Sequence, residues 1–496
     1  MKNRRFIKQI CFLNVVLAII SFLLIPYSVY AEESTSDTRV LDVKDFKSFK
    51  AAVQEYKSIN TDMLIKVDNI TITEKIIIPT NNKNKILTIE GLYENKPALL
   101  SRGVLGEIFT VSSGARVVLE DLIIDGKNSD TYAKDGGGPL ININKDGKLL
   151  LSKNAKLQNN NNSISGGVFN SGLLIIDGGS ITNCNADIGG GVYNNGEMIF
   201  TRGNITECTA VNLGGGICSN GKLNINGGVI RSCSAVYGGG VFHHPLNGSR
   251  NANPSISIEP FIFRSGQIVD CAAKLLGGGI YNSSDTYVLG GTISRCTAMR
   301  GGGIHSDGYY GSNTTGDKEY VARLFLISAT ISGCTAVIDE SIQEGGQGTG
   351  GGIYNTAKMY SIHEEVIDCS SEDGRLPVIS EGMHYYYKVM TKEELINLFP
   401  EVIEILKTPD YSTYDYYNST VPNINDTIQI PNVCWNTPTY ARNAIKDLPI
   451  VIVEIREIYA PQVTPGMIIG QWPIPGETEY PSEVSKIGLC IYVSTN

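Results

Sequence analysis

A glycine triplet followed by a β-branched residue recurs along the middle of the chain, beginning at Gly189, Gly214, Gly238, Gly277, Gly301 and Gly350. Successive triplets are 25, 24, 39, 24 and 49 residues apart, so the two long intervals contain insertions. A period near 24 residues is too short for a pair of helices and is typical of a solenoid. Because the repeated segments are rich in β-branched residues and have no helical period, we expect the coils to be made of strands.

Equivalent residues of successive coils should form columns, because neighbouring strands lie about 4.8 Å apart. Seven cysteines are predicted to form one such column: Cys184, Cys208, Cys233, Cys271, Cys296, Cys334 and Cys369. We expect free thiols that fill the core, since stacked side chains point the same way rather than toward each other. The second and third residues after each triplet predict an aromatic column, which includes His305, and an asparagine-rich column, which includes His243.

These columns on glycine corners resemble those of right-handed parallel β-helix proteins. The Gly-Gly-(Val/Ile) blocks are similar to bacterial surface repeats of the pectate-lyase-like and adhesin types. The resemblance covers residues 60–370 and implies an all-β fold, a right-handed parallel β-helix solenoid. Within residues 32–59, an amphipathic helix is expected after Asp45 and would cap the solenoid. Residues 371–429 are expected to connect or cap its far end, with a short helix after Thr391 that Pro400 interrupts.

The last 67 residues, 430–496, resemble a PASTA domain, the small α+β module named for penicillin-binding proteins and serine/threonine kinases. The resemblance lies in Ile430-Pro431-Asn432-Val433, the helix start at Thr437, and Gln471-x-Pro473-x-Pro475-Gly476. It implies contact with peptidoglycan, with Trp435, Gln471 and Trp472 as candidate binding residues. Trp435 replaces the usual glycine, so the module could equally be a spacer or a docking cap. Whether Cys434 and Cys490 pair stays open.

The N-terminus predicts export. The basic residues Lys2, Arg4, Arg5 and Lys8 precede an apolar stretch, 10–24, and a small-residue cleavage site ends at Ala31. This pattern indicates a signal peptide, residues 1–31, and a secreted protein of the cell surface or cell wall. No second apolar stretch follows, so no membrane span is expected after cleavage. The abundance of Asn, Lys, Ile and Tyr favours an AT-rich Gram-positive source.

Charge argues against nucleic acid as a partner. Of 41 Lys and Arg residues, removing the four of the signal leaves 37, against 50 Asp and Glu, and they form no basic patch. Peptidoglycan, another cell-wall glycan, or a host or cell-surface ligand fits an exported protein better. No metal-ligand spacing or cofactor motif occurs, so neither a metal nor a cofactor is expected.

Two insertions, about 243–261 and 305–322, should leave the same corner of the solenoid two coils apart. Because loops on a rigid scaffold carry function, their edge is the predicted binding surface. Its candidate residues are His243, His244, His305, Tyr309 and Tyr310. The alternative is that the insertions are tolerated decoration. A third insertion, about 338–349, leaves from a different edge.

A polysaccharide lyase or glycoside hydrolase is the competing hypothesis, since right-handed β-helix proteins include such enzymes. The residue before each column cysteine should be exposed, and there Glu207 and Asp270 lie two coils apart, compatible with an inverting pair. Arg295 should lie beside Asp270, so a surface salt bridge is the simpler interpretation. We therefore favour a non-enzymatic adhesin or ligand-binding protein, and leave enzymatic activity open.

Overall fold

The computed structural model describes most of residues 38–406 and parts of the remaining chain. The described ranges are 38–93, 96–127, 138–161, 165–244, 260–310, 320–338, 348–362, 364–372, 374, 378–380, 386–406, 428–429, 438, 441, 450–459, 468–472, 478–479 and 487–495. The predicted signal peptide, residues 1–31, lies outside them. Among the described residues, none of the helices combines the length and apolar character of a membrane span.

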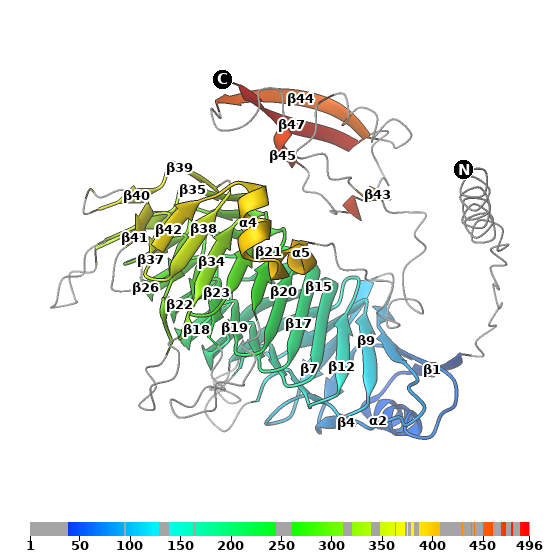
Figure 1. Cartoon of the computed structure of the whole chain (residues 1–496). Coiled ribbons are helices and arrows are strands. Elements are labelled where there is room, and N and C mark those ends of the chain that lie inside the picture. Colours follow the sequence, from blue (N-terminus) through cyan, green and yellow to red (C-terminus); the bar gives the residue numbers. More distant parts are fainter. Residues whose placement is uncertain are drawn as a thin grey trace, which may run out of the picture. The chain divides into compact units, whose positions relative to one another are not determined.

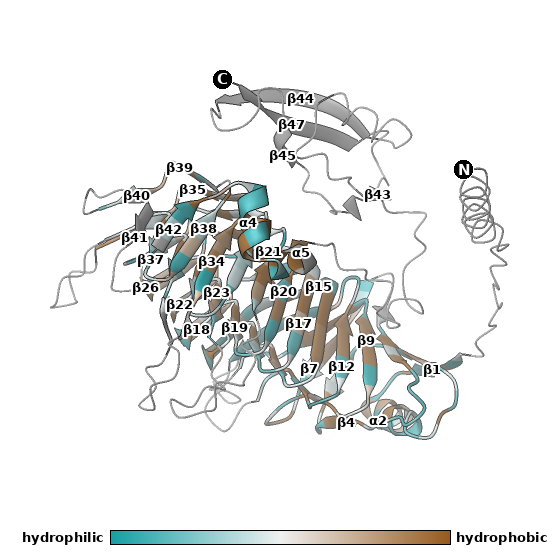
Figure 2. Ribbon diagram, in the orientation of Figure 1, coloured by the Kyte–Doolittle hydropathy of each residue, from teal (hydrophilic) through white to brown (hydrophobic). Residues whose placement is uncertain are grey.

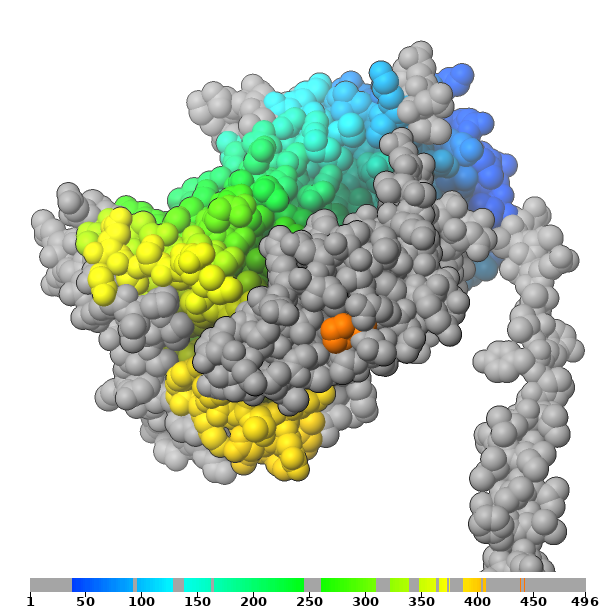
Figure 3. Space-filling view, turned by 90° about the horizontal axis from the view of Figure 1, so that it is seen from above, coloured from blue at the N-terminus to red at the C-terminus, as the bar shows by residue number. Residues whose placement is uncertain are grey.

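Parallel strands stacked in four columns make up most of the described chain (Figure 1). Columns I to III belong to one 29-stranded sheet, and column IV is a separate 11-stranded sheet. Between β15 and β37, each coil runs from column IV through columns I, II and III, and a glycine triplet leads back to column IV. Among the described residues, the earlier coils have no strand in column III. This all-β arrangement is consistent with a parallel β-helix. In the space-filling view, the coils follow one another in sequence order from blue to yellow (Figure 3).

Column I consists of β1 (Arg39–Val43), β2 (Met63–Val67), β5 (Leu87–Glu90), β9 (Arg116–Glu120), β12 (Lys148–Leu151), β15 (Leu173–Ile188), β17 (Glu197–Thr206), β20 (Lys222–Ile225), β24 (Phe261–Phe263), β28 (Thr286–Val288), β34 (Arg323–Leu326), β38 (Lys358–Ser361) and β42 (Tyr386–Val389). Column II consists of β3 (Ile70–Ile72), β7 (Lys96–Arg102), β10 (Leu122–Asp125), β13 (Lys156–Asn161), the second parts of β15 and β17, β21 (Val229–Arg231), β25 (Gln267–Val269), β29 (Thr292–Ser294), β35 (Ala329–Ser332) and β39 (Glu364–Ile367).

Column III consists of the end of β15, β18 (Thr209–Leu213), β22 (Ser234–Tyr237), β26 (Ala272–Leu276), β30 (Thr297–Ala298), β36 (Thr335–Ala336) and β40 (Ser370–Ser371). Column IV consists of β4 (Ile76–Ile78), β8 (Phe109–Val111), β11 (Ile141–Ile143), β14 (Val168–Asn170), β16 (Val192–Asn194), β19 (Ile217–Ser219), β23 (Val241–His243), β27 (Ile280–Asn282), β31 (Ile304–Ser306), β37 (Ile353–Asn355) and β41 (Val378–Ser380). The short strands β6 (Leu92–Tyr93), β32 (Tyr309–Tyr310) and β33 (Tyr320–Val321) form antiparallel pairs, β6 with β7 and β32 with β33.

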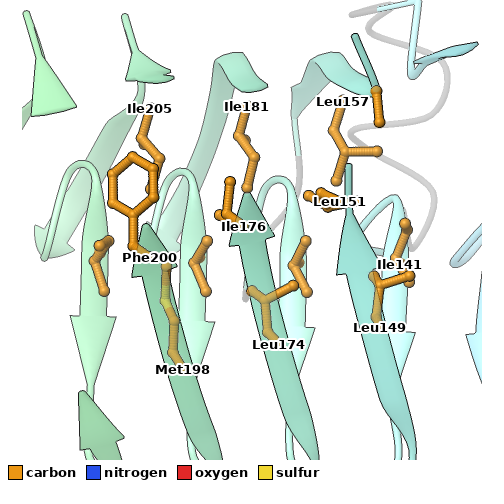
Figure 4. Close-up of a cluster of buried hydrophobic side chains, with 14 of the residues drawn as sticks. Ile141, Leu149, Leu151, Leu157, Leu174, Ile176, Ile181, Met198, Phe200 and Ile205 are labelled. Carbon is orange, nitrogen blue, oxygen red and sulfur yellow. The ribbon is translucent and has the colours of Figure 1, made fainter. Parts of the chain in front are cut away.

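The predicted register is confirmed. The apolar residues of column II pair coil by coil in the order Ile181, Ile205, Ile230, Ile268, Ile293, Ile331 and Val366. Alternate side chains of column I point inward to meet them, as Leu149, Leu174 and Met198 do in Figure 4. Apolar residues, coloured brown, lie on many of the strands in Figure 2. Stacking therefore buries one continuous core, as expected when a single coil cannot bury its own apolar face.

The cysteine column also lies where it was predicted. Six of its members are buried and Cys369 is partly buried, and all seven are free thiols. Five of the thiols lie against the third glycine of the preceding coil's triplet: Cys208, Cys233, Cys271, Cys296 and Cys334. At Gly240, for example, an added Cβ would lie 2.7 Å from the Gly279 carbonyl oxygen, 2.7 Å from Ile268 Cγ2 and 3.4 Å from Cys271 Sγ. The first glycine of that triplet, Gly238, has a φ of 64°, which forms the corner.

Helix α2 (Phe46–Glu55) begins as the sequence predicts, with Asp45 Oδ1 accepting a hydrogen bond of 2.8 Å from the Ser48 backbone N–H. Its buried residues Phe49 and Val53 join the core of the first coils, and Tyr56, which follows the helix, does the same. The helix packs against β1, β2, β3 and β4. The apolar face of this amphipathic helix therefore packs into the same core as the strands.

Two helices follow the last coil. Helix α4 (Lys392–Leu398) starts with the capping box predicted at Thr391, which Glu394 completes, and α5 (Glu401–Leu406) follows Pro400. Both helices pack on the side of column I rather than across its end. Phe399, between the helices, lies 5.1 Å from the Phe325 ring and 4.6 Å from the Tyr360 ring. The physical reason is that β28, β34 and β38 carry outward aromatic residues that need cover.

The C-terminal residues form a small mixed sheet of their own. Strand β44 (Ile450–Tyr459) is parallel to β47 (Ile487–Thr495), and β45 (Ile468–Trp472) is antiparallel to β47. A two-strand pair joins β43 (Ile428–Gln429) to β46 (Thr478–Glu479). Trp435 and Cys434 lie outside the described residues, and Gln471 and Trp472 end β45.

Candidate functional site

The first two insertions leave from the same end of column IV. Val241 of β23 pairs with Ile280 of β27, which pairs with Ile304 of β31, so β23 and β31 are separated by one strand. The strand spacing places their ends about 10 Å apart, as predicted. The insertions themselves, residues 245–259 and 311–319, lie outside the described residues. The third insertion reaches β37 from the opposite end of the column.

His243 belongs to the core rather than to this edge. The polar column into which it falls is fully buried, and His243 itself has 0% of its surface exposed. Its Nδ1 lies 2.8 Å from Ser284 Oγ, and its Nε2 lies 3.4 Å from the Gly221 carbonyl oxygen. Burial lowers the pKa of His243 to about 4, so the ring is neutral and structural. It has no surface on which to receive a ligand.

His305 lies on the outward side of column IV, inside a stack of rings. Its ring is 5.3 Å from Tyr281 and 5.2 Å from Tyr354, with interplanar angles of 8° and 14°, and Phe242 stacks on Tyr281 at 4.8 Å. Because the rings cover each other's faces, they present only their edges outward and cannot act as a flat platform for a ligand.

Burial lowers the pKa of His305 to about 4, and its buried Nδ1 has no hydrogen-bond partner among the described residues. A neutral imidazole therefore fills an aromatic position, which supports a structural role for His305.

A row of polar residues lies where the two insertions leave. We call this row the polar edge: His244, Ser283, Asp307 and Thr356, each one position beyond the buried polar column. The His244 ring and the Ser283 hydroxyl are hydrogen-bonded. Asp307 accepts hydrogen bonds from Tyr281 Oη at 3.0 Å and from Thr356 Oγ1 at 3.4 Å. Hydroxyl, imidazole and carboxylate groups thus meet in one row, which suits recognition of a polar, hydroxyl-rich ligand.

Burial lowers the pKa of His244, and the nearby Asp307 carboxylate opposes that shift. Of the predicted binding residues, His244 alone has a described side chain in the polar edge. Tyr309 and Tyr310 form β32, shortly after Asp307, and β32 pairs with β33, which follows the second insertion. The side chains of these two tyrosines are not among those that the structure describes. The sequence analysis missed Ser283, Asp307 and Thr356. Their shared position, four residues after the triplet, was the available signal.

The candidate catalytic residues occupy a tight corner rather than an open strand face. Glu207, Asp270 and Arg295 all have left-handed backbone angles, with φ of 56°, 56° and 50°. Arg295 donates to both oxygens of Asp270, at 2.7 and 3.0 Å, and Arg231 adds a third bond at 3.4 Å. These hydrogen bonds from Arg295 hold the pKa of Asp270 below its usual value. The predicted salt bridge is therefore present, and both carboxylate oxygens of Asp270 are paired with arginine.

Gly333 fills the same corner position with a φ of 59°, and this glycine was the signal that the position is a turn. Within the described ranges, no group of three or more His, Cys, Asp or Glu side chains is placed to hold a metal ion. Comparison with protein-family models, curated proteins and solved structures finds no match to this chain. The PASTA resemblance therefore rests on the sequence motifs alone, whereas the parallel strand columns are consistent with the β-helix resemblance.

Proposed function

We propose that this chain is a secreted, cell-wall-associated protein of the Gram-positive surface whose role is to bind a ligand. In this proposal the solenoid is a right-handed β-helix, α2 caps its first coil, and the polar edge with the paired insertions binds the ligand. The observation that carries the proposal is the departure of both long insertions from neighbouring positions of one polar row. The rigid columns beneath would hold such a surface in place at little entropic cost.

The ligand class that fits is a polar glycan of the cell wall or of another cell surface. The polar edge offers donors and acceptors, and the stacked rings next to it are occupied by each other. Recognition would therefore depend on hydrogen bonds from His244 and Asp307 and on the inserted residues, rather than on ring stacking, while the buried Ser283 hydroxyl holds the His244 ring. An adhesin that contacts a host or neighbouring cell is the biological role that fits this surface.

The C-terminal module is proposed to be PASTA-like and to hold the protein near peptidoglycan. Its support is the ordered set of motifs in residues 430–496. Export is proposed from the signal-peptide pattern of residues 1–31.

Binding by the polar edge can be tested with the full mature chain. We would replace 245–259 and 311–319 with short Gly-Ser linkers and measure retention on purified peptidoglycan and on a panel of surface polysaccharides. The matched control shortens the third insertion, 339–347, in the same way. We expect the paired replacement to abolish retention on the glycan that the wild type binds, and the control to preserve it. Equal retention by both variants would remove the polar edge as the binding surface.

The module has its own test. Deleting 430–496 should reduce retention on peptidoglycan while leaving binding to any other surface glycan unchanged. If deletion has no effect, the module is a spacer.

The enzymatic alternative predicts release of reducing or unsaturated ends from the same panel. It would displace our proposal if Asp270→Asn abolished that release and Glu207→Gln reduced it.

A further inference from the structure

Column I carries apolar residues on its outward face as well as on its inward face. Val118, Leu150, Ile175 and Ile199 are direct register partners on β9, β12, β15 and β17, and each alternates with neighbours that point into the core. We call these four residues the flank stripe. They form a cluster separate from the main core. Their exposed fractions are nevertheless 0, 3, 1 and 2%, although they face away from the core.

Elsewhere on the same face, helices provide the cover. Ile262, Tyr287 and Phe325 continue the outward row of column I and pack against α4 and α5. The cluster that contains the flank stripe includes no residue from a helix or from another column. Among the described residues, no helix packs against the flank stripe.

The chain leaves α5 beside this row. The Ile405 carbonyl accepts a hydrogen bond from Arg264, which directly follows β24. After Leu406, which ends α5, the next described residue is Ile428, so 21 residues, 407–427, lie between them. From β24 to β9 there are five strand steps, or about 24 Å. An extended chain of that length reaches about 70 Å, so it can run along the whole stripe and return.

The composition of residues 407–427 matches the stripe. The segment contains apolar and aromatic residues, Tyr411, Tyr414, Tyr416, Tyr417, Val421 and Ile424. It has one lysine and three aspartates, a net charge of −2. On the stripe's own face, Arg116 and Lys148 precede Val118 and Leu150 by two residues. Aromatic side chains would cover the apolar row while the carboxylates meet these cations.

We propose that the tyrosine-rich segment 407–427 docks along the flank stripe as an intramolecular strap. The flank of the solenoid is then an interaction surface already filled by the chain's own segment, distinct from the polar edge on column IV. The strap continues the cover that α4 and α5 begin and ends where β43 starts. This inference does not depend on which ligand the polar edge binds.

The test is limited proteolysis of the full mature chain with a protease that cleaves after aromatic residues. The double variant Ile175→Lys/Ile199→Lys places charges on the outward face and leaves the inward side chains in place. We expect cleavage within 407–427 to become at least tenfold faster. The matched control, Thr182→Lys/Thr206→Lys, changes an outward pair of column II whose hydroxyls lie 2.7 Å apart, and should leave the cleavage rate unchanged.

A second variant keeps the test decisive if the lysine pair impairs folding. Replacing Tyr414, Tyr416 and Tyr417 by Ser should release the strap and increase binding of a dye specific for apolar surfaces, while the thermal transition of the sheet is retained. Unchanged cleavage in the lysine variant and unchanged dye binding in the serine variant would overturn the proposal. So would a wild-type dimer that Ile175→Lys/Ile199→Lys converts to a monomer, because a second copy would then cover the stripe.

Discussion

The corner before each core cysteine allows a quantitative test of how the coils turn. Its non-glycine residues have φ values between 50° and 56°: Asn159, Asn183, Glu207, Ser232, Asp270, Arg295 and Asp368. An L-residue pays about 1–2 kcal/mol to adopt a left-handed conformation. Glycine adopts it freely, but costs about 0.4–1 kcal/mol through the greater freedom of the unfolded chain. The difference predicts that Glu207→Gly stabilises the folded solenoid by about 0.5–1 kcal/mol.

Glu207 is the best position for this test because its side chain is exposed. The matched control is Asn204→Gly, at an exposed residue of β17, the strand that ends just before Glu207, where the extended backbone gives glycine no advantage. We expect the control to lose about 0.5–1 kcal/mol. The converse change, Gly333→Ser, should lose about 1 kcal/mol through backbone strain alone, because an added Cβ would contact just Arg295 Cγ, at 3.6 Å.

The measurement is denaturation by urea followed by far-ultraviolet circular dichroism, which reports the sheet. Both tryptophans of the chain, Trp435 and Trp472, lie in the C-terminal module, so their fluorescence would report that module instead. We expect the midpoint to rise for Glu207→Gly and to fall for the control and for Gly333→Ser. If Glu207→Gly lowered the midpoint as much as Asn204→Gly does, the left-handed corner would not be a source of strain.

Three further predictions concern the core, the helices and the histidines. Gly240→Ala should destabilise the fold by about 1–3 kcal/mol in the same urea assay, because the new methyl would overlap the next coil's backbone and Ile268; an unchanged midpoint would show that the corner can relax. Arg323→Ala removes ion pairs to Asp285 and to a carboxylate of α5, and we expect faster amide hydrogen exchange in α4 and α5 with unchanged exchange in column II. His305→Phe should flatten the dependence of stability on pH. The folded pKa of about 4 lies below the unfolded value near 6.5, so His305 makes the wild type lose stability as pH falls from 6.5 to 4. The variant should lose less over the same range, and its remaining loss would include that of His243, whose pKa is also lowered to about 4. Thermal melts at pH 7 and pH 4.5 check this, and an equal drop in both proteins would contradict it.

The repeat made the columns predictable from the sequence. A fixed period carries both the strand register and the inward direction of each residue, so the cysteine column and the isoleucine row of column II could be assigned from spacing alone. The helix starts at Asp45 and Thr391 were equally readable, because capping depends on local side-chain chemistry.

What the period does not carry is the local backbone angle. Asp270 and Glu207 were expected on an open strand face because neighbouring residues alternate in a regular strand. The chain instead turns there, and the signal was a single glycine, Gly333, among seven residues of other types. Pairs such as Asp270 and Arg295 could still be predicted, because register places them side by side.

Side-chain contacts between coils, and between the coils and the two helices, could not be predicted from the sequence. The docking of α4 and α5 on the flank of column I depends on outward aromatic residues whose spacing resembles that of the inward ones. The bond between Tyr281 and Asp307 joins two coils through side chains whose rotamers no spacing specifies. The sequence therefore predicted where the polar edge lies, but not which residues form it.

The column of reduced sulfur atoms has a practical consequence for studying how this rod comes apart. Burial raises the pKa of the Cys233 thiol and shields it, whereas Cys369 in the last coil is already partly accessible. A thiol-alkylating reagent applied under mild destabilising conditions should therefore label these sites in an order that records where fraying starts and how far it has travelled. The cysteine column thus provides one labelling site in each successive coil.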